Sequence, residues 1–235
     1  MSELILVRHG QASFGAESYD KLSAQGARQI EILADYWRTL GDQFDHLYSG
    51  ELKRQIETAE GLRSLVTAPD AIQVHPGFNE YNGEPIISLY LRDHAAADGF
   101  GDNVQLPITD RKTFQLVLEA ATTRWINDTL EASNADAGYE SWRDFQARVH
   151  GALDELMQRH TGGSRVLVST SGGVIALALQ RALQLPDNQV LATNWMVHNS
   201  SVTRLVYGRG KVSLASFNSL AHLEVPAWRD LITFR

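Results

Sequence analysis

The chain has 235 residues, a formal net charge of −7 and a hydrophobic content of 43%. This length suits one α/β domain, or one domain with an inserted subdomain. The acidic balance argues against non-specific binding to nucleic acid or to an anionic membrane, because both need a basic footprint. The sequence contains no cysteine, which excludes disulfides, a thiolate nucleophile and a cysteine-based metal site.

The sequence offers no candidate for a membrane-spanning helix. Its longest apolar run, residues 174–185, is interrupted by Gln180, Arg181 and Gln184. That run is also shorter than the roughly 20 residues that a span requires. The N-terminus lacks a basic region, and its apolar run is too short for a signal peptide. We therefore expect a cytoplasmic protein.

The first part of the chain alternates apolar strands with helices. Residues 4–7 form a continuous apolar run, which is typical of a buried parallel strand. Ser23 is expected to cap an amphipathic helix that follows it. Short strands are predicted at 45–49 and 71–74, with a helix over 51–66 between them.

The middle of the chain has a different character. Residues 81–138 contain several glycines and prolines and carry a weaker strand signal, although a helix fits 111–131. We interpret residues from about 85 to 138 as a helical cap that is inserted into a single α/β domain and lies over one end of its sheet.

The last part of the chain returns to strongly patterned elements. An amphipathic helix begins at Trp142, a strand is predicted at 165–169, and a helix that is apolar nearly all round covers 174–183. Two closing strands, 201–207 and 212–217, are joined by a glycine turn. This order predicts an α/β fold with a mostly parallel central sheet flanked by helices on both faces.

Two turns that follow strands carry the residues of chemical interest. Arg8 and His9 come directly after the first strand, and Ser171, Gly172 and Gly173 come directly after a later one. Ligands of such folds bind outside the carboxyl ends of the strands. The shared placement of the two turns therefore predicts one site.

The residue types at these turns suit phosphoryl transfer. A guanidinium matches phosphate oxygens bidentately, and cationic neighbours keep an imidazole neutral and nucleophilic. Arg8 beside His9 therefore suits a phosphohistidine intermediate, although a solvated arginine beside a core histidine is the alternative. Arg54 begins a helix and can point to the same sheet end, or it can pair with Glu51 or Glu57 on the surface.

A carboxylate in a loop can serve as the acid and base of such a reaction. Glu80 follows a short strand and a glycine, where it could protonate a leaving oxygen and then activate water. Glu84 competes for this role. Either residue can equally be an ordinary loop carboxylate.

A series of separated motifs resembles the histidine phosphatase superfamily, in its phosphoglycerate-mutase-like branch. In chain order they are RHGQAS, LSAQGARQIEIL, YSGELKRQIETAE, FNE, YESWRDFQARV, VLVSTSGGVIA, NSSVTRL and AHLE. The resemblance spans nearly the whole chain. It is weakest between about 85 and 138, where that family varies its substrate cap.

The resemblance implies a phosphatase that hydrolyses a small phosphomonoester. His9 would be the phosphorylated nucleophile, and Glu80 the proton donor. The phosphate would be bound by Arg8, Arg54, Ser171 and Gly172. No metal and no cofactor is implied, and the partner is a small phosphorylated substrate. The oligomeric state stays open.

Ser171 departs from the family, which usually has histidine before the Gly-Gly pair. A serine cannot carry positive charge, and the loss of one such donor to an oxyanion can cost about 2.7–4 kcal/mol. We therefore expect that Ser171→His would raise kcat, unless His198 supplies the missing cation. Two alternatives stay open: a phosphoglycerate-mutase-type phosphotransferase, which residues 11–14 disfavour, and a phosphate-ligand binding protein that has lost turnover.

Overall fold

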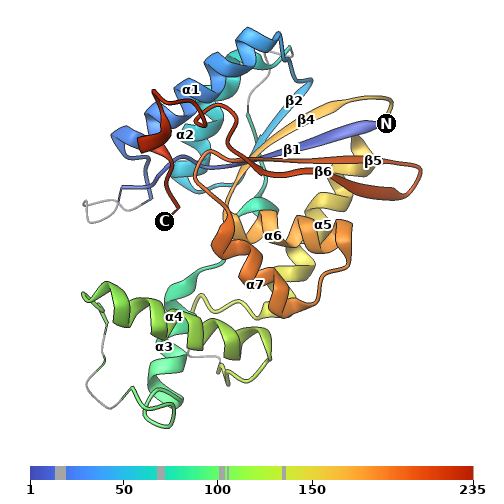
Figure 1. Ribbon diagram of the computed structural model, residues 1–235. Coiled ribbons are helices and arrows are strands. Elements are labelled where there is room, and N and C mark those ends of the chain that lie inside the picture. The colour runs from blue at the N-terminus through green and yellow to red at the C-terminus, as the bar shows by residue number, and fades with distance from the viewer. Residues whose placement is uncertain (14–19, 68–71, 101–103, 105, 134–135, 235) are drawn as a thin grey trace. The chain divides into compact units, whose positions relative to one another are not determined.

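The computed structural model describes residues 1–13, 20–67, 72–100, 104, 106–133 and 136–234 (Figure 1). The chain forms two compact units. The first unit contains Met1–Glu80 and Arg148–Arg235, and the second contains Tyr81–Ala147. In chain order, the second unit is therefore an insertion into the first.

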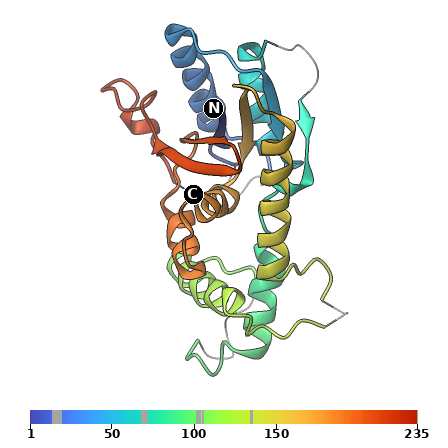
Figure 2. The same ribbon diagram turned by 90° about the vertical axis from the view of Figure 1, so that its right-hand side faces the viewer.

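The first unit is built on a six-stranded sheet in the order β3-β2-β4-β1-β5-β6. Pairing is parallel from β3 to β1, whereas β5 and β6 are antiparallel to their neighbours. The β5–β6 pair lies at the opposite edge of the sheet from β3 (Figure 2). The mostly parallel sheet is confirmed. Its strands are β1 (Ser2–Arg8), β2 (His46–Ser49), β3 (Gln73–Val74), β4 (Arg165–Thr170), β5 (Val202–Gly208) and β6 (Lys211–Ser219).

Helices α1 and α2 cover one face of the sheet. Ile5 and Val7 of β1 belong to one apolar cluster with residues of both helices. Because side chains alternate along a strand, the equally buried Leu4 and Leu6 point to the other face. A hydrogen bond of 3.2 Å from His150 to the carbonyl of Leu177 joins α5 to α6. The helices of the first unit are α1 (Ala24–Leu40), α2 (Lys53–Leu62), α5 (Trp142–Arg159), α6 (Gly172–Leu183) and α7 (Asp187–Met196). The first residues of α5, up to Ala147, belong to the second unit.

The predicted helix after Ser23 is confirmed, and two other helices were not predicted. The Ser23 side chain accepts a hydrogen bond from the main-chain N–H of Gly26 and caps α1. The unpredicted helices are α3 (Gly83–Asp93) and α7. Pro85 gave α3 the pattern of a loop, but a proline in the first helical turn costs no internal hydrogen bond. In α7, polar residues on several sides obscure the helical periodicity.

The second unit contains α3 and α4 (Arg111–Ile126). Helix α4 ends before the predicted residue 131, and Asp128 just beyond it has a positive φ of 56°. An aromatic cluster forms the core, with ring centroids 4.8 Å apart for Tyr81 and Trp125 and 5.1 Å for Trp125 and Trp142. In the described part of the chain, no helix combines the length and the apolar character needed to cross a membrane.

Candidate functional site

The parallel strands β1 and β4 end side by side and bring the two turns together. The strands pair in register through Arg8 and Thr170. The main-chain N–H of His9 donates to the carbonyl of Thr170 at 2.8 Å. His9 and Ser171 are the next residues along the two strands, so both lie at the carboxyl end of the sheet, where ligands bind in folds of this kind.

The imidazole of His9 is buried and held at both nitrogens. Nδ1 lies 2.7 Å from the carbonyl oxygen of Gly10. A carbonyl can only accept, so Nδ1 carries the hydrogen. Nε2 accepts a hydrogen bond of 3.1 Å from Nε of Arg54. The lone pair of Nε2 therefore faces the guanidinium of Arg54.

The surroundings of His9 keep it uncharged. Burial holds the pKa of His9 well below its usual value of 6.5, and the positive charges of Arg54 and Arg8 lower the pKa further. The hydrogen bond to the Gly10 carbonyl opposes this shift only in part. The imidazole is therefore neutral at neutral pH, and its Nε2 keeps a nucleophilic lone pair.

Arg54 is oriented by Asp20, an acidic residue that was not among the predicted site residues. Its NH1 lies 2.6 Å from Oδ1 of Asp20, and the side chain of Arg54 is only 13% exposed. The other oxygen of Asp20 accepts from the main-chain N–H of Lys53, at the start of α2. Asp20 thus holds the helix start and the guanidinium together, a favourable place for an anion at a helix N-terminus.

The glutamates that competed for Arg54 have other partners. Glu51 accepts from the side chain of Asn79 at 2.8 Å, and Glu57 accepts from the main-chain N–H of Leu22 at 2.7 Å. Arg54 instead extends to the sheet end, as its hydrogen bond to His9 requires.

Arg8 and His9 are adjacent in sequence, but their side chains have different partners. NH1 of Arg8 donates to the carbonyl of Val197, just beyond the end of α7. The ring of His198, the candidate replacement cation, lies 3.0 Å from Nδ2 of Asn218 and packs against the ring of Phe234, with centroids 5.4 Å apart. The described contacts of the His198 ring are thus with Asn218 of β6 and with Phe234 in the C-terminal segment.

Ser171 lies at the N-cap position of α6 and is 1% exposed. Its side chain makes no capping bond to the helix. Instead, Ser171 Oγ accepts a hydrogen bond of 2.8 Å from Nε2 of Gln55, which also donates to the carbonyl of Phe78 at 2.9 Å. Gln55 was not among the predicted site residues, although it directly follows Arg54.

The first turn of α6 contacts the predicted acid. The main-chain N–H of Gly173 donates to Oε2 of Glu80 at 3.0 Å. A Cβ at Gly172 would lie only 2.3 Å from Oδ1 of Asn194, so the side chain of Asn194 packs closely against this glycine. Glu80 therefore belongs to the same cluster of residues as Ser171.

The competing acid belongs to the other unit. Glu84 lies in the first turn of α3, where its main-chain N–H donates to the side chain of Asn82. Glu80 is the last residue of the first segment of the unit that contains His9.

A further loop supports the turn after β1. The main-chain N–H of Ser200 donates to the carbonyls of Arg8 and His9, at 3.1 and 3.3 Å, and Nδ2 of Asn199 also donates to that of His9. The hydroxyl of Ser200 forms a 2.9 Å hydrogen bond with Nε2 of the buried His222. Asn199 and Ser200 belong to the motif NSSVTRL, and His222 belongs to the motif AHLE. Their role in supporting the turn after β1 is visible only from contacts between distant segments.

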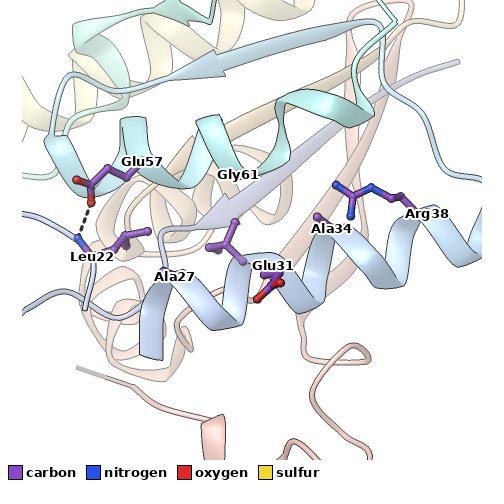
Figure 3. Close-up of a pocket in the computed structure, with 8 residues that line it drawn as sticks. Leu22, Ala27, Glu31, Ala34, Arg38, Glu57 and Gly61 are labelled. Carbon is purple, nitrogen blue, oxygen red and sulfur yellow. Dashed lines mark hydrogen bonds between the residues drawn. The ribbon is translucent and has the colours of Figure 1, made fainter. Parts of the chain in front are cut away.

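A groove of about 440 Å³ lies between α1 and α2 (Figure 3). None of the predicted site residues lines it. Its walls are mostly apolar, with charged groups among them, and consist of Leu22, Ala27, Ile30, Glu31, Ala34, Arg38, Glu57 and Gly61. Among the residues that the structure describes, no group of three or more histidine, aspartate or glutamate side chains is arranged to hold a metal ion.

Several solved structures share this fold. Phosphoglycerate mutase from Bacillus anthracis is 20% identical with a TM-score of 0.65, and the match covers 94% of each chain. A phosphoserine phosphatase mutant from Entamoeba histolytica is 19% identical with a TM-score of 0.63, covering 95% of this chain and 100% of the other. A mycobacterial glucosyl-3-phosphoglycerate phosphatase bound to inorganic phosphate is 22% identical with a TM-score of 0.63, with the same coverage.

The comparison with family models agrees with the motifs found in the sequence. No curated protein matches the chain. The model of the histidine phosphatase superfamily (branch 1) matches residues 4–97 and 105–220. This match covers the strand ends, the two arginines and both turns described above, and the chain therefore belongs to the histidine phosphatase superfamily.

Proposed function

We propose that the protein hydrolyses a small phosphomonoester through a phosphohistidine intermediate on His9. The observation that carries the proposal is the neutral His9 imidazole, whose Nε2 lone pair faces the guanidinium of Arg54. A nucleophile beside a fixed cation suits phosphoryl transfer, which depends mainly on positioning and on neutralising oxygen charge.

In the first step, Nε2 of His9 attacks the phosphorus while the bond to the leaving oxygen breaks. Arg54 and Arg8 neutralise the phosphoryl oxygens, together with the hydroxyl of Ser171 and the main chain at Gly172. The phosphoryl oxygens take over the Arg54 donors, and this releases the lone pair of Nε2. Glu80 gives its proton to the leaving oxygen.

In the second step, the ionised Glu80 takes a proton from a water molecule. The water oxygen attacks the phosphorus, the bond to Nε2 breaks, and inorganic phosphate leaves. His9 is again neutral and Glu80 is again protonated, so the cycle closes without any further reactant.

The substrate class follows from the comparison by analogy. The similar structures include phosphatases of phosphoserine and of glucosyl-3-phosphoglycerate, which are small phosphomonoesters. We propose that the inserted second unit forms the predicted cap and carries the substrate specificity. We also propose a cytoplasmic location, in line with the expectation from the sequence.

The test is a panel of small phosphomonoesters, with release of inorganic phosphate as the readout. Brief incubation with substrate should leave a phosphoryl group on His9, detectable by peptide mass spectrometry under alkaline conditions. A His9→Ala variant should show neither product. If the wild-type protein binds phosphate but releases none from any ester, the binding-protein alternative, which Ser171 favours, replaces the hydrolase.

Phosphoglycerate isomers in the same panel test the remaining alternative. Transfer of the phosphoryl group between two hydroxyls, without release of phosphate, would identify a mutase. We expect release of inorganic phosphate, because residues 11–14 disfavour a mutase and water is the proposed acceptor of the phosphoryl group.

A further inference from the structure

Gln55 is a fully buried polar residue whose amide is used on all sides. Nε2 donates to Ser171 Oγ at 2.8 Å and to the Phe78 carbonyl at 2.9 Å. Oε1 accepts from the main-chain N–H of Leu52 at 3.3 Å. Burying such a group without partners would be costly, so this network fixes the amide in one orientation.

The orientation of Gln55 determines what the Ser171 hydroxyl can do. An amide nitrogen can only donate, so Ser171 Oγ is the acceptor in their bond. The hydroxyl hydrogen must therefore point elsewhere. Among the described residues no acceptor is recorded for it, and Ser171 Oγ does not cap α6.

We propose that Gln55 is a positioning residue that turns the Ser171 hydroxyl hydrogen toward a phosphoryl oxygen. The proposal rests on the proposed function, because it assigns a further residue to the same site. Gln55 itself does not reach the phosphate, since both hydrogens of its Nε2 are already donated. It acts through Ser171 and makes a neutral hydroxyl a directed donor.

The same contact makes residues 55 and 171 a matched pair in size. The Gln55 side chain fills the space beside Ser171, and a Cβ at Gly50 would lie only 2.0 Å from its Oε1. A histidine at position 171 would enter space that Gln55 occupies, and overpacking a dense core is destabilising. A histidine therefore requires a smaller residue at position 55.

A double-mutant cycle tests the positioning role. The variants are Gln55→Met, which keeps the volume but removes the amide, Ser171→Ala, and the combination of both. We expect Ser171→Ala to lower kcat by about 10²-fold, as for one lost oxyanion donor. Gln55→Met should lower kcat by about tenfold, the size of one lost hydrogen bond, with less effect on KM. In the Ser171→Ala background, Gln55→Met should cause no further loss.

The control is Gln180→Ala, which removes another buried amide. Gln180 donates to the carbonyl of Leu185 and to Asp187 within the α6–α7 region. It should leave kcat unchanged. Equal losses from Gln55→Met with and without Ser171 would overturn the proposal, because Gln55 would then act on the fold rather than on the hydroxyl. Full activity of Gln55→Met would overturn it as well.

The affinity for inorganic phosphate, measured by calorimetry, separates this proposal from the proposed function. If the wild type hydrolyses no ester, the hydrolase proposal fails, but the cycle can still be measured in the Kd for phosphate. Gln55→Met should weaken phosphate binding only when Ser171 is present. A second pair tests the size argument. Because Gln55 occupies the space beside residue 171, Ser171→His alone should lose activity, contrary to the gain in kcat expected from the sequence, and Gln55→Ala/Ser171→His should exceed that single variant at least tenfold. Equal activities of the two histidine variants would contradict the matched pair.

Discussion

The turns after β1 and β4 each place a glycine close to another segment of the chain, but the two turns differ in their packing and in their chemistry. A Cβ at Gly10 would lie 2.5 Å from the carbonyl oxygen of Gly26, and one at Gly172 would lie 2.3 Å from Oδ1 of Asn194. The main chain of Gly26 cannot give way, so the first turn needs glycine, whereas the second turn faces the end of a side chain that can shift. The first turn also carries ionisable groups, Arg8 and His9, whereas the second carries a neutral hydroxyl.

This difference shows how charge is distributed in the site. Both cations that lower the pKa of His9, Arg54 and Arg8, reach it from α2 and β1. The turn after β4 contributes dipoles instead, through the Ser171 hydroxyl and the N–H groups of α6. In the proposed mechanism, the first turn performs the chemistry and the second supports the developing charge. Each prediction below tests that division.

The largest effect is expected at the first turn. His9→Ala should remove essentially all turnover, because no other residue is proposed to form the covalent intermediate. The measurement is kcat on the best ester of the panel, with thermal unfolding as the control for folding. Turnover near the wild-type level would mean that the division between the two turns is wrong.

The next effect is expected at Glu80, which accepts a hydrogen bond from Gly173 beside the second turn. Glu80→Gln keeps the shape but cannot exchange a proton, so kcat should fall by about 10²–10⁴. The matched control is Glu84→Gln in the other unit, which should change kcat less than Glu80→Gln does. A reversed order would assign the acid to Glu84. The fall should be smaller for an ester whose leaving group needs no protonation.

The support beneath the first turn predicts a pH-dependent stability. Burial lowers the pKa of His222, the partner of Ser200, to about 4 from 6.5. Between about pH 6.5 and pH 4, His222 therefore binds a proton in the unfolded chain but stays neutral in the folded protein. His222 thus reduces the free energy of unfolding as the pH falls from about 6.5 to about 4, by roughly 3 kcal/mol in total.

Urea unfolding at pH 7.5 and at pH 4.5, for the wild type and for His222→Gln, measures this contribution. Other histidines whose pKa is lowered by burial also reduce the free energy of unfolding in acid. Only the difference between the wild type and the variant is therefore assigned to His222. The variant should lose less stability on acidification. Parallel curves for the two proteins would show that His222 is not responsible.

The smallest effect is expected at Asp20. Its carboxylate, 41% exposed, lies 2.6 Å from the guanidinium that is proposed to bind phosphate. Asp20→Asn removes a negative charge that competes with the substrate, and exposed ion pairs are weak, so the Kd for inorganic phosphate should fall by only about threefold. Titration calorimetry at low and high salt measures it. Weaker phosphate binding in the variant would mean that Asp20 orients Arg54 more than it competes with the ligand.

Local patterns were enough to predict most elements of the first unit. The continuous apolar run of β1 and the Ser23 cap of α1 are both found as expected. The α3 and α7 helices were missed, because a proline in the first turn and a mixed polar surface hide the 3.6-residue period. What failed was the recognition of helices whose pattern is weak.

The functional groups that follow each strand, and the mostly parallel pairing of the strands, could be predicted from the sequence itself. An apolar run that ends in Arg8 and His9, and another that ends in Ser171, must bring these residues to one end of a parallel sheet. This conclusion needs only short-range patterns and the rule for parallel strands. Arg54 was a candidate for the same place for the same reason.

The partners of these groups were decided by the tertiary structure alone. Asp20 holds Arg54 across 34 positions of the chain, and Gln55 meets Ser171 across 116. No local pattern encodes such contacts. A polar side chain needs a hydrogen-bond partner within the protein only once it is buried away from water, and the fold determines which groups are then within reach. The resemblance thus predicted a serine at the position where the family usually has histidine, but only the folded chain reveals the buried amide of Gln55 that contacts this serine.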